Sequence, residues 1–187
     1  MKTSINKLEY TFLTIVIMLA SFKCFSQEDK LTREEKKSAK KEQAYFNFQV
    51  MDSMIMNKSF VLEADFLENG YGGRRPVMSN INFIMVDSLK AVLQTGNDSR
   101  MGYNGVGGIT AEGRISNMKI TKNEKSLSFF LRFTVTTQIG FYDVAMNIYS
   151  SNFARAEITG LTAGKLIYDG RIQTLYNSRV YKGRSIV

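Results

Sequence analysis

From Ser59 onward, apolar residues recur at every second position in short segments, and this pattern constrains the fold more than any other feature. In FVLEADFLE (60–68), Phe60 and Leu62 alternate with polar neighbours such as Glu63 and Asp65, which is the period of a half-buried strand. The other segments with strand character are 81–87, 90–95, 114–121, 126–137, 143–150, 154–160 and 165–172. Short turns join most neighbours, so the strands are expected to run antiparallel, because parallel strands need crossovers of about a dozen residues or more.

About eight strands with no helix between them predict a mainly β domain. The sequence leaves open whether this domain, 59–187, is an antiparallel sandwich or a partly closed barrel. The polar and basic tail that follows 165–172 is a candidate edge strand.

A helix is predicted before the strands, within 27–58. Thr32 and Glu35 have the spacing of a capping box, which satisfies the first free amides of a helix. The apolar positions that share one helical face are Ala44, Phe48, Met51 and Ile55. The helix is therefore expected from about Arg33 to Met56, charged in its first half and amphipathic in its second.

The first 26 residues have the pattern of a secretory signal peptide. A basic start is followed by thirteen apolar residues, 10–22, which is shorter than the stretch of about 20 that spans a bilayer. Cleavage is expected between Ser26 and Gln27, which predicts a periplasmic or extracellular protein. A lipid anchor at Cys24 is the less favoured alternative, because Lys23 occupies the position where a lipoprotein signal has a small residue.

The charge of the chain, +8, is concentrated near the predicted helix, where six Lys or Arg residues lie within 30–41. A solvated helix surface explains such a run. A peripheral contact with an anionic envelope surface is the alternative. Nucleic acid is not expected as a partner, because the chain carries an export signal and shows no recognition motif for it.

The residues that are missing exclude several chemistries. The chain has no histidine and a single cysteine, Cys24, inside the predicted signal. Imidazole bases, thiol nucleophiles and the usual zinc ligands are therefore absent from the mature domain. We expect no cofactor, no metal and no catalytic residue. Carboxylate chemistry is the enzymatic alternative, with Glu63 and Asp65 on one strand face and with acids on the late strands. These late acids are Asp143, Glu157 and Asp169.

The stretch GYNGVGGITAEGR (102–114) comes near two phosphate-binding patterns and matches neither. Thr110 stands where the dinucleotide motif requires a third glycine, and Arg114 and Ile115 replace the Lys and Ser/Thr of a P-loop. A strand is expected next, whereas both motifs open a helix. A glycine-dense turn or bulge is the interpretation that fits.

The two loops richest in glycine, 69–80 and 96–108, are the candidate ligand site, because loops at one end of a β structure often carry function. Each loop contains tyrosine and arginine, which suit an anionic or sugar ligand. The candidate residues are Tyr71, Arg74, Arg75, Arg100, Tyr103, Asn104 and Arg114.

Several segments resemble a family of exported Bacteroidota proteins of unknown function, DUF4251. They are NFIMVD (82–87), GYNGVGGITAEGRISNMKI (102–120), ARAEITG (154–160), KLIYDGRI (165–172) and SRVYKG (178–183). The resemblance implies export and a compact β-rich domain, and it implies no catalytic residue, cofactor or substrate. The function expected is non-enzymatic binding of a small ligand or an envelope protein. The alternatives are a carboxylate-dependent glycan hydrolase and an accessory subunit of an envelope complex.

Overall fold

The computed structural model describes residues 32–97, 104–160 and 164–185. The chain divides into two compact units, Met1–Lys40 and Lys41–Val187. The described part of the first unit contains the start of α2 (Arg33–Met56). The predicted capping box is present: the Thr32 amide donates to Glu35 Oε2 at 2.7 Å, and the Glu35 amide donates to Thr32 Oγ1 at 3.3 Å. The bonds from the Thr32 backbone and side chain lower the pKa of the Glu35 carboxyl.

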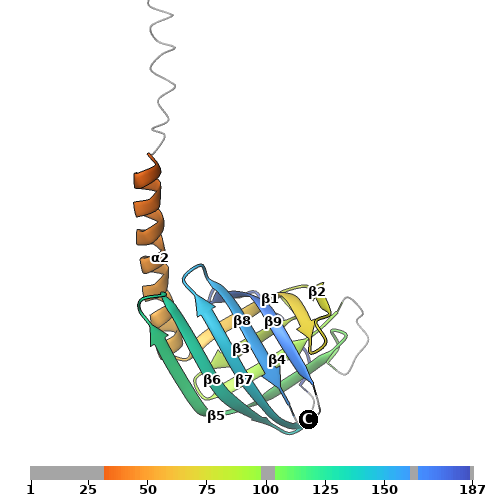
Figure 1. The fold of residues 1–187 in the computed structure, drawn as a ribbon. Coiled ribbons are helices and arrows are strands. Elements are labelled where there is room, and N and C mark those ends of the chain that lie inside the picture. The colour runs from red at the N-terminus through yellow and green to blue at the C-terminus, as the bar shows by residue number, and fades with distance from the viewer. Residues whose placement is uncertain (1–31, 98–103, 161–163, 186–187) are drawn as a thin grey trace, which may run out of the picture. The chain divides into compact units, whose positions relative to one another are not determined.

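Within the described residues, the second unit contains the end of α2 and the strands of a single sheet (Figure 1). The strands are β1 (Ser59–Asn69), β2 (Arg74–Pro76), β3 (Phe83–Asp87), β4 (Lys90–Thr95), β5 (Ile109–Asn123), β6 (Ser128–Thr137), β7 (Gly140–Tyr149), β8 (Phe153–Thr159) and β9 (Lys165–Gln173). Every pairing is antiparallel.

The sheet closes on itself because β1 pairs with β9 as well as with β3. Eight strands, β1 and β3 to β9, follow one another around a closed barrel, and β2 pairs only with the end of β1. The prediction of a mainly β antiparallel domain with one N-terminal helix is confirmed, and the closed β1–β9 pairing decides for a barrel. The short strand β2 was not expected.

Alternating side chains fill the barrel. Phe60 and Leu62 of β1 face the interior with Phe129 and Leu131 of β6, and all four are buried. On β9, Gly170 lies opposite Ala64 and Ala154. A Cβ atom on Gly170 would overlap the β1 backbone, so glycine permits the close approach of β1 and β9 that completes the barrel.

Residues 41–56 of α2 close one end of the barrel. Phe48, Met51 and Ile55 of the predicted apolar face are buried in the same cluster as the inward side chains, as is Met54. The ring of Phe48 stacks on that of Phe129, with centroids 4.8 Å apart. The amphipathic second half of the predicted helix is therefore confirmed.

The segment after β9 crosses the outside of the barrel. Leu175 and Val180 pack on a second apolar cluster formed by the outward side chains of Val61, Phe83 and Val92. The described residues 174–185 form no strand, so the expectation of an edge strand is wrong. The physical reason is closure: β9 pairs with β1 and offers no free edge.

Candidate ligand site at the open end of the barrel

Two adjacent pockets lie where β1, β4 and β8 end and where β5, β7 and β9 begin. The larger pocket has a volume of about 540 Å³ and the smaller about 310 Å³. Thr95 of β4 and Leu166 of β9 line both. We call this end, with the described parts of the loops that join β1 to β3, β4 to β5, β6 to β7 and β8 to β9, the mouth.

Inward-facing side chains make the walls of the smaller pocket mostly apolar. Leu93 of β4, Ala111 of β5, Tyr142 of β7 and Ile158 of β8 contribute to it. They lie on the face of the sheet that carries the core, because Leu93, Ala111 and Ile158 belong to the core cluster and Tyr142 packs against it. The smaller pocket is therefore the upper end of the barrel interior.

Tyr168 and the residues beneath it form the floor of this pocket. The Tyr168 hydroxyl donates to the Gln94 carbonyl at 3.1 Å, and burial raises the pKa of the phenol. The ring stays neutral at physiological pH and adds no charge to the floor. Deeper in the barrel, Phe133, Val135 and Val144 are almost wholly buried. The space therefore suits a compact apolar group.

The larger pocket adds a positive charge. Arg75 of β2 lines it, opposite Leu67 of β1 in the strand pairing. Among the described residues, no carboxylate lies within ion-pair distance of Arg75. Lys165, which lines the smaller pocket, is paired with Glu157 at 3.2 Å. The Arg75 guanidinium is thus a cation of the described mouth without a carboxylate partner among the described residues.

Arg74, the neighbour of Arg75, points to the outer wall and joins an ion cluster there. Arg155 donates to both oxygens of Asp169 at 2.7 and 2.9 Å and to Glu68 at 3.0 Å. Arg74 lies 3.3 Å from Asp169 and 4.0 Å above the ring centroid of Phe66. Burial opposes the charge of Arg155, but its bonds to Glu68 and Asp169 outweigh this and raise its pKa. The cluster fastens β1, β2, β8 and β9 together.

Asn104 holds the glycine-rich loop in place. Its amide nitrogen donates to the Thr95 carbonyl and the Thr110 hydroxyl, at 3.0 and 3.1 Å. Its oxygen accepts from the amides of Val106 and Gly108, at 3.1 and 3.0 Å. Asn104 is buried, and its four bonds anchor residues 104–108 to the end of β4 and the start of β5. The last part of GYNGVGGITAEGR is already strand, since β5 starts at Ile109.

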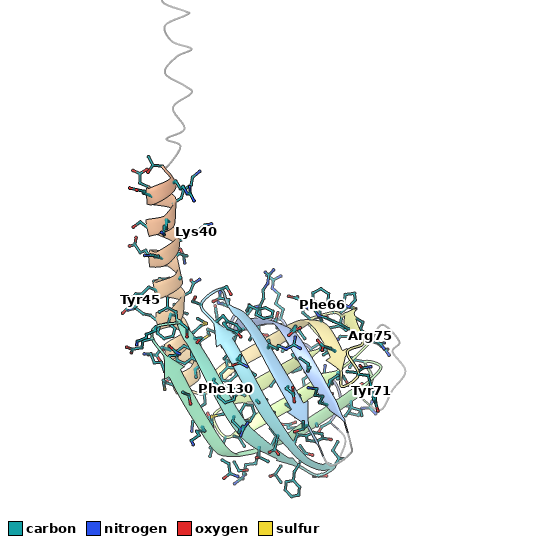
Figure 2. All side chains as sticks on the ribbon, viewed as in Figure 1. Lys40, Tyr45, Phe66, Tyr71, Arg75 and Phe130 are labelled. Atoms are coloured by element: carbon teal, nitrogen blue, oxygen red, sulfur yellow. The ribbon has the colours of Figure 1, made fainter. Side chains whose placement is uncertain are left out.

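The remaining candidate residues are spread over the chain. Tyr71 lies in the turn between β1 and β2, with 99% of its surface exposed, and it lines neither pocket. Figure 2 shows Tyr71 and Arg75 at the same end of the barrel. Arg114 is exposed on β5, opposite Lys90 and Thr136, and lines neither pocket. The candidates Arg100, Tyr103, Ser26 and Gln27 lie outside the described residues.

Sequence reasoning did not name Tyr142, Leu166 and Tyr168 as site residues. A signal for them exists: alternation in KLIYDGRI puts Leu166 and Tyr168 on one strand face, and Tyr142 precedes Val144 by two. The pattern gives the face but not the height along the barrel. Only the pairing of β9 with β1 and β8 shows that Leu166 lies at an end.

The acids do not converge on a pocket. Among the described residues, no Asp or Glu lines either pocket of the mouth. Glu63 accepts bonds from Gln173 and Ser178, at 2.9 and 2.6 Å, and Asp65 lies 3.9 Å from Arg171. The described ranges also contain no cluster of three acidic, histidine or cysteine side chains that could hold a metal. Nor does any helix within them have the length and apolarity needed to cross a bilayer.

Comparison with known proteins agrees with the fold and names a family. The family model described as "Domain of unknown function (DUF4251)" matches residues 40–172. The chain belongs to this family. The prediction from the sequence segments is therefore confirmed, and the matched range covers α2 from Lys40 through most of β9.

A solved structure of a DUF4251 family protein, from Bacteroides eggerthii, is similar to this chain. The two share 24% sequence identity with a TM-score of 0.62, over 77% of this chain and 99% of the other. At this identity the likeness supports the fold alone. No curated protein matches the chain.

Proposed function

We propose that the domain is an exported, non-enzymatic binding protein whose mouth holds a small amphipathic anion. By this we mean an apolar ring or short chain that carries a carboxylate, sulfate or phosphate group. The observation that carries the proposal is the junction of two pockets: an apolar one inside the barrel and one that contains an unpaired arginine, with Thr95 and Leu166 in both.

The apolar part of the ligand is limited by the packing of the barrel. An eight-stranded barrel is just wide enough to be filled by side chains or to hold one small ligand. Here Phe133 and Val144 fill the middle, and the space that remains, about 310 Å³, lies at the low end of the range for ligand pockets. A short chain or a single ring suits this volume.

The anionic part is assigned to Arg75. A guanidinium group binds carboxylate or phosphate through two parallel hydrogen bonds. Arg74 and Arg155 already use this capacity on Asp169 and Glu68, whereas Arg75 has no carboxylate partner among the described residues. Arg75 is exposed on β2, so its guanidinium is accessible to a ligand, and the apolar Leu67 and Val77 line the same pocket.

Isothermal titration calorimetry with octanoate, octanamide and octylamine tests the charge preference. We expect octanoate to bind more tightly than the other two. Arg75→Gln should weaken octanoate binding about tenfold or more, because a hydrogen bond to a charged group contributes about 1.5–3 kcal/mol, and should change octanamide binding little. Arg114→Gln, which removes an exposed arginine that lines neither pocket, is the matched control and should change neither.

A second pair of variants tests the apolar pocket. Ala111→Leu should fill the smaller pocket and abolish binding, with circular dichroism as the check on folding. Ile158→Ala enlarges the pocket and should shift the preference toward longer carboxylates. The proposal is overturned if none of these amphiphiles binds, or if binding is indifferent to Arg75→Gln and to both pocket variants.

A further inference from the structure

The mouth is surrounded by apolar side chains that no other described element covers. They come from separate loops and strand ends: Tyr71 between β1 and β2, Met78 between β2 and β3, Ile109 at the start of β5, and Ile139 and Phe141 at the β6–β7 turn. Phe141, on the outer face of β7, is 55% exposed. We call these five residues the rim.

The position of the rim distinguishes it from scattered apolar residues, which are normal on protein surfaces. Two of its members, Met78 and Ile109, also line the pockets. Phe141 adjoins Tyr142 of the smaller pocket, and the Phe141 carbonyl lies near Gly160 in the β8–β9 loop. The apolar surface of the pockets therefore continues onto Met78 and Ile109 of the rim. Continuous exposed apolar surface of this kind marks an interaction site.

The charges around the rim favour an anionic partner. Glu157 is paired with Lys165, and Glu112 with Lys182 at 2.6 Å. Asp169 and Glu68 are neutralised in the ion cluster of the outer wall. Asp143, two residues from Phe141 on the same outer face of β7, accepts a bond from the Thr134 hydroxyl at 2.7 Å and has no cationic partner among the described residues. Arg75, next to the rim, is a cation without a carboxylate partner among the described residues.

We propose that the rim docks the mouth onto the surface of a bilayer that contains anionic lipid. The partner is a bilayer because the proposed ligand, on which this inference rests, is itself an amphiphile that partitions into one. Apolar side chains at the headgroup boundary together with a cation give reversible surface binding. This contact differs from one made through the basic residues 30–41, since it uses the opposite end of the second unit from that closed by residues 41–56.

Co-sedimentation with vesicles tests the surface. The full domain is mixed with vesicles of phosphatidylcholine alone or with added phosphatidylglycerol. We expect binding to the anionic vesicles, and a loss of about tenfold or more in the double variant Ile139→Ser, Phe141→Ser. The matched control, Phe130→Ser with Phe153→Ser, removes two exposed aromatic residues of the outer wall and should bind as the parent does.

Three outcomes overturn the inference: no binding by the parent, equal loss in rim and control variants, or loss only when Lys36, Lys37, Lys40 and Lys41 are changed to Gln. Calorimetry with octanoate, without vesicles, separates this result from the proposed function. A rim variant that binds octanoate normally but not vesicles supports both. Vesicle binding by a parent that binds no amphiphile supports the docking surface and sinks the proposed ligand.

Discussion

The two ends of the barrel are built from different interactions. At the end closed by residues 41–56, Phe48, Met51 and Ile55 are buried among apolar side chains. At the mouth, the described residues leave two pockets. Four of the five buried polar and charged residues of the described chain lie toward the mouth, namely Asn82, Gln94, Asn104 and Thr110, and the fifth, Asp169, belongs to the ion cluster of the outer wall. One end is therefore held by packing and the other by directed hydrogen bonds.

This difference has a consequence for function. Packing of apolar side chains fills the barrel interior at the closed end, because protein interiors have crystal-like density, and the pocket of about 380 Å³ at that end lies beside α2. Hydrogen bonds hold loops in fixed positions while the space between them stays open. Asn82 illustrates this, since it donates to the Met78 carbonyl and accepts from the Gly96 amide, at 2.9 Å each, and so joins two mouth loops. A site can therefore form at the mouth.

The largest effect is expected from a cavity at the closed end. Met51→Ala should lower the free energy of unfolding by about 2–5 kcal/mol, because it removes a fully buried side chain. Met78→Ala, at the rim, should change it by less than about 0.5 kcal/mol, since Met78 is 48% exposed. Urea denaturation measures both. Equal destabilisation by the two variants would refute the division of the barrel into a packed end and an open end.

A smaller but more local effect is expected from Gln94, the centre of the hydrogen bonds at the mouth. Its amide nitrogen donates to the carbonyls of Ile81 and Tyr181, at 3.1 and 2.8 Å. Its oxygen accepts from the Gly183 amide and the Thr110 hydroxyl, both at 2.8 Å. Gln94→Met should cost about 1–3 kcal/mol, because it leaves buried groups without partners.

Hydrogen exchange locates this loss. We expect faster exchange in residues 178–185, which Gln94 ties to the barrel, and unchanged exchange in residues 41–56. Gln49→Met, on the exposed side of α2, is the control and should alter neither. Uniform acceleration across the chain in the Gln94 variant would mean that the mouth is not a separately stabilised region.

The strands and the helix could be predicted from the sequence because their periods are local. The spacing of Phe48, Met51 and Ile55 is that of one helical face, and the alternation around Phe60 and Leu62 is that of a strand. Each pattern lies within one element, so a reader of the sequence needs no information about partners.

Barrel closure and the site could be predicted only in part, because they depend on register between distant segments. Glu63 and Gln173, which meet where the barrel closes, are 110 residues apart in the chain. The composition of the glycine-rich loops predicts Arg75, which lines a pocket, but it equally predicts Tyr71 and Arg114, which line neither pocket of the mouth. Leu166 and Tyr168 were assigned to a strand and not to a site, since nothing local shows how high on the barrel a strand residue lies.

The smallest effect is a pH dependence at the closed end. Lys122 Nζ of β5 donates to Asp52 Oδ2 of α2 at 3.0 Å, and this bond raises the pKa of the lysine above 10.5. A lysine whose pKa is higher in the folded state than in the unfolded state stabilises the folded state at pH values below the unfolded-state pKa. This contribution to stability disappears as the pH rises through the folded-state pKa. The melting temperature of the parent should therefore fall more steeply above pH 10.5 than that of Lys122→Met.

The control is Lys119→Met, which removes an exposed lysine of the same strand and should follow the parent curve. Thermal melts from about pH 9 to about pH 11.5 decide the point, and parallel curves for the parent and Lys122→Met would show that Asp52 and Lys122 are not coupled in solution.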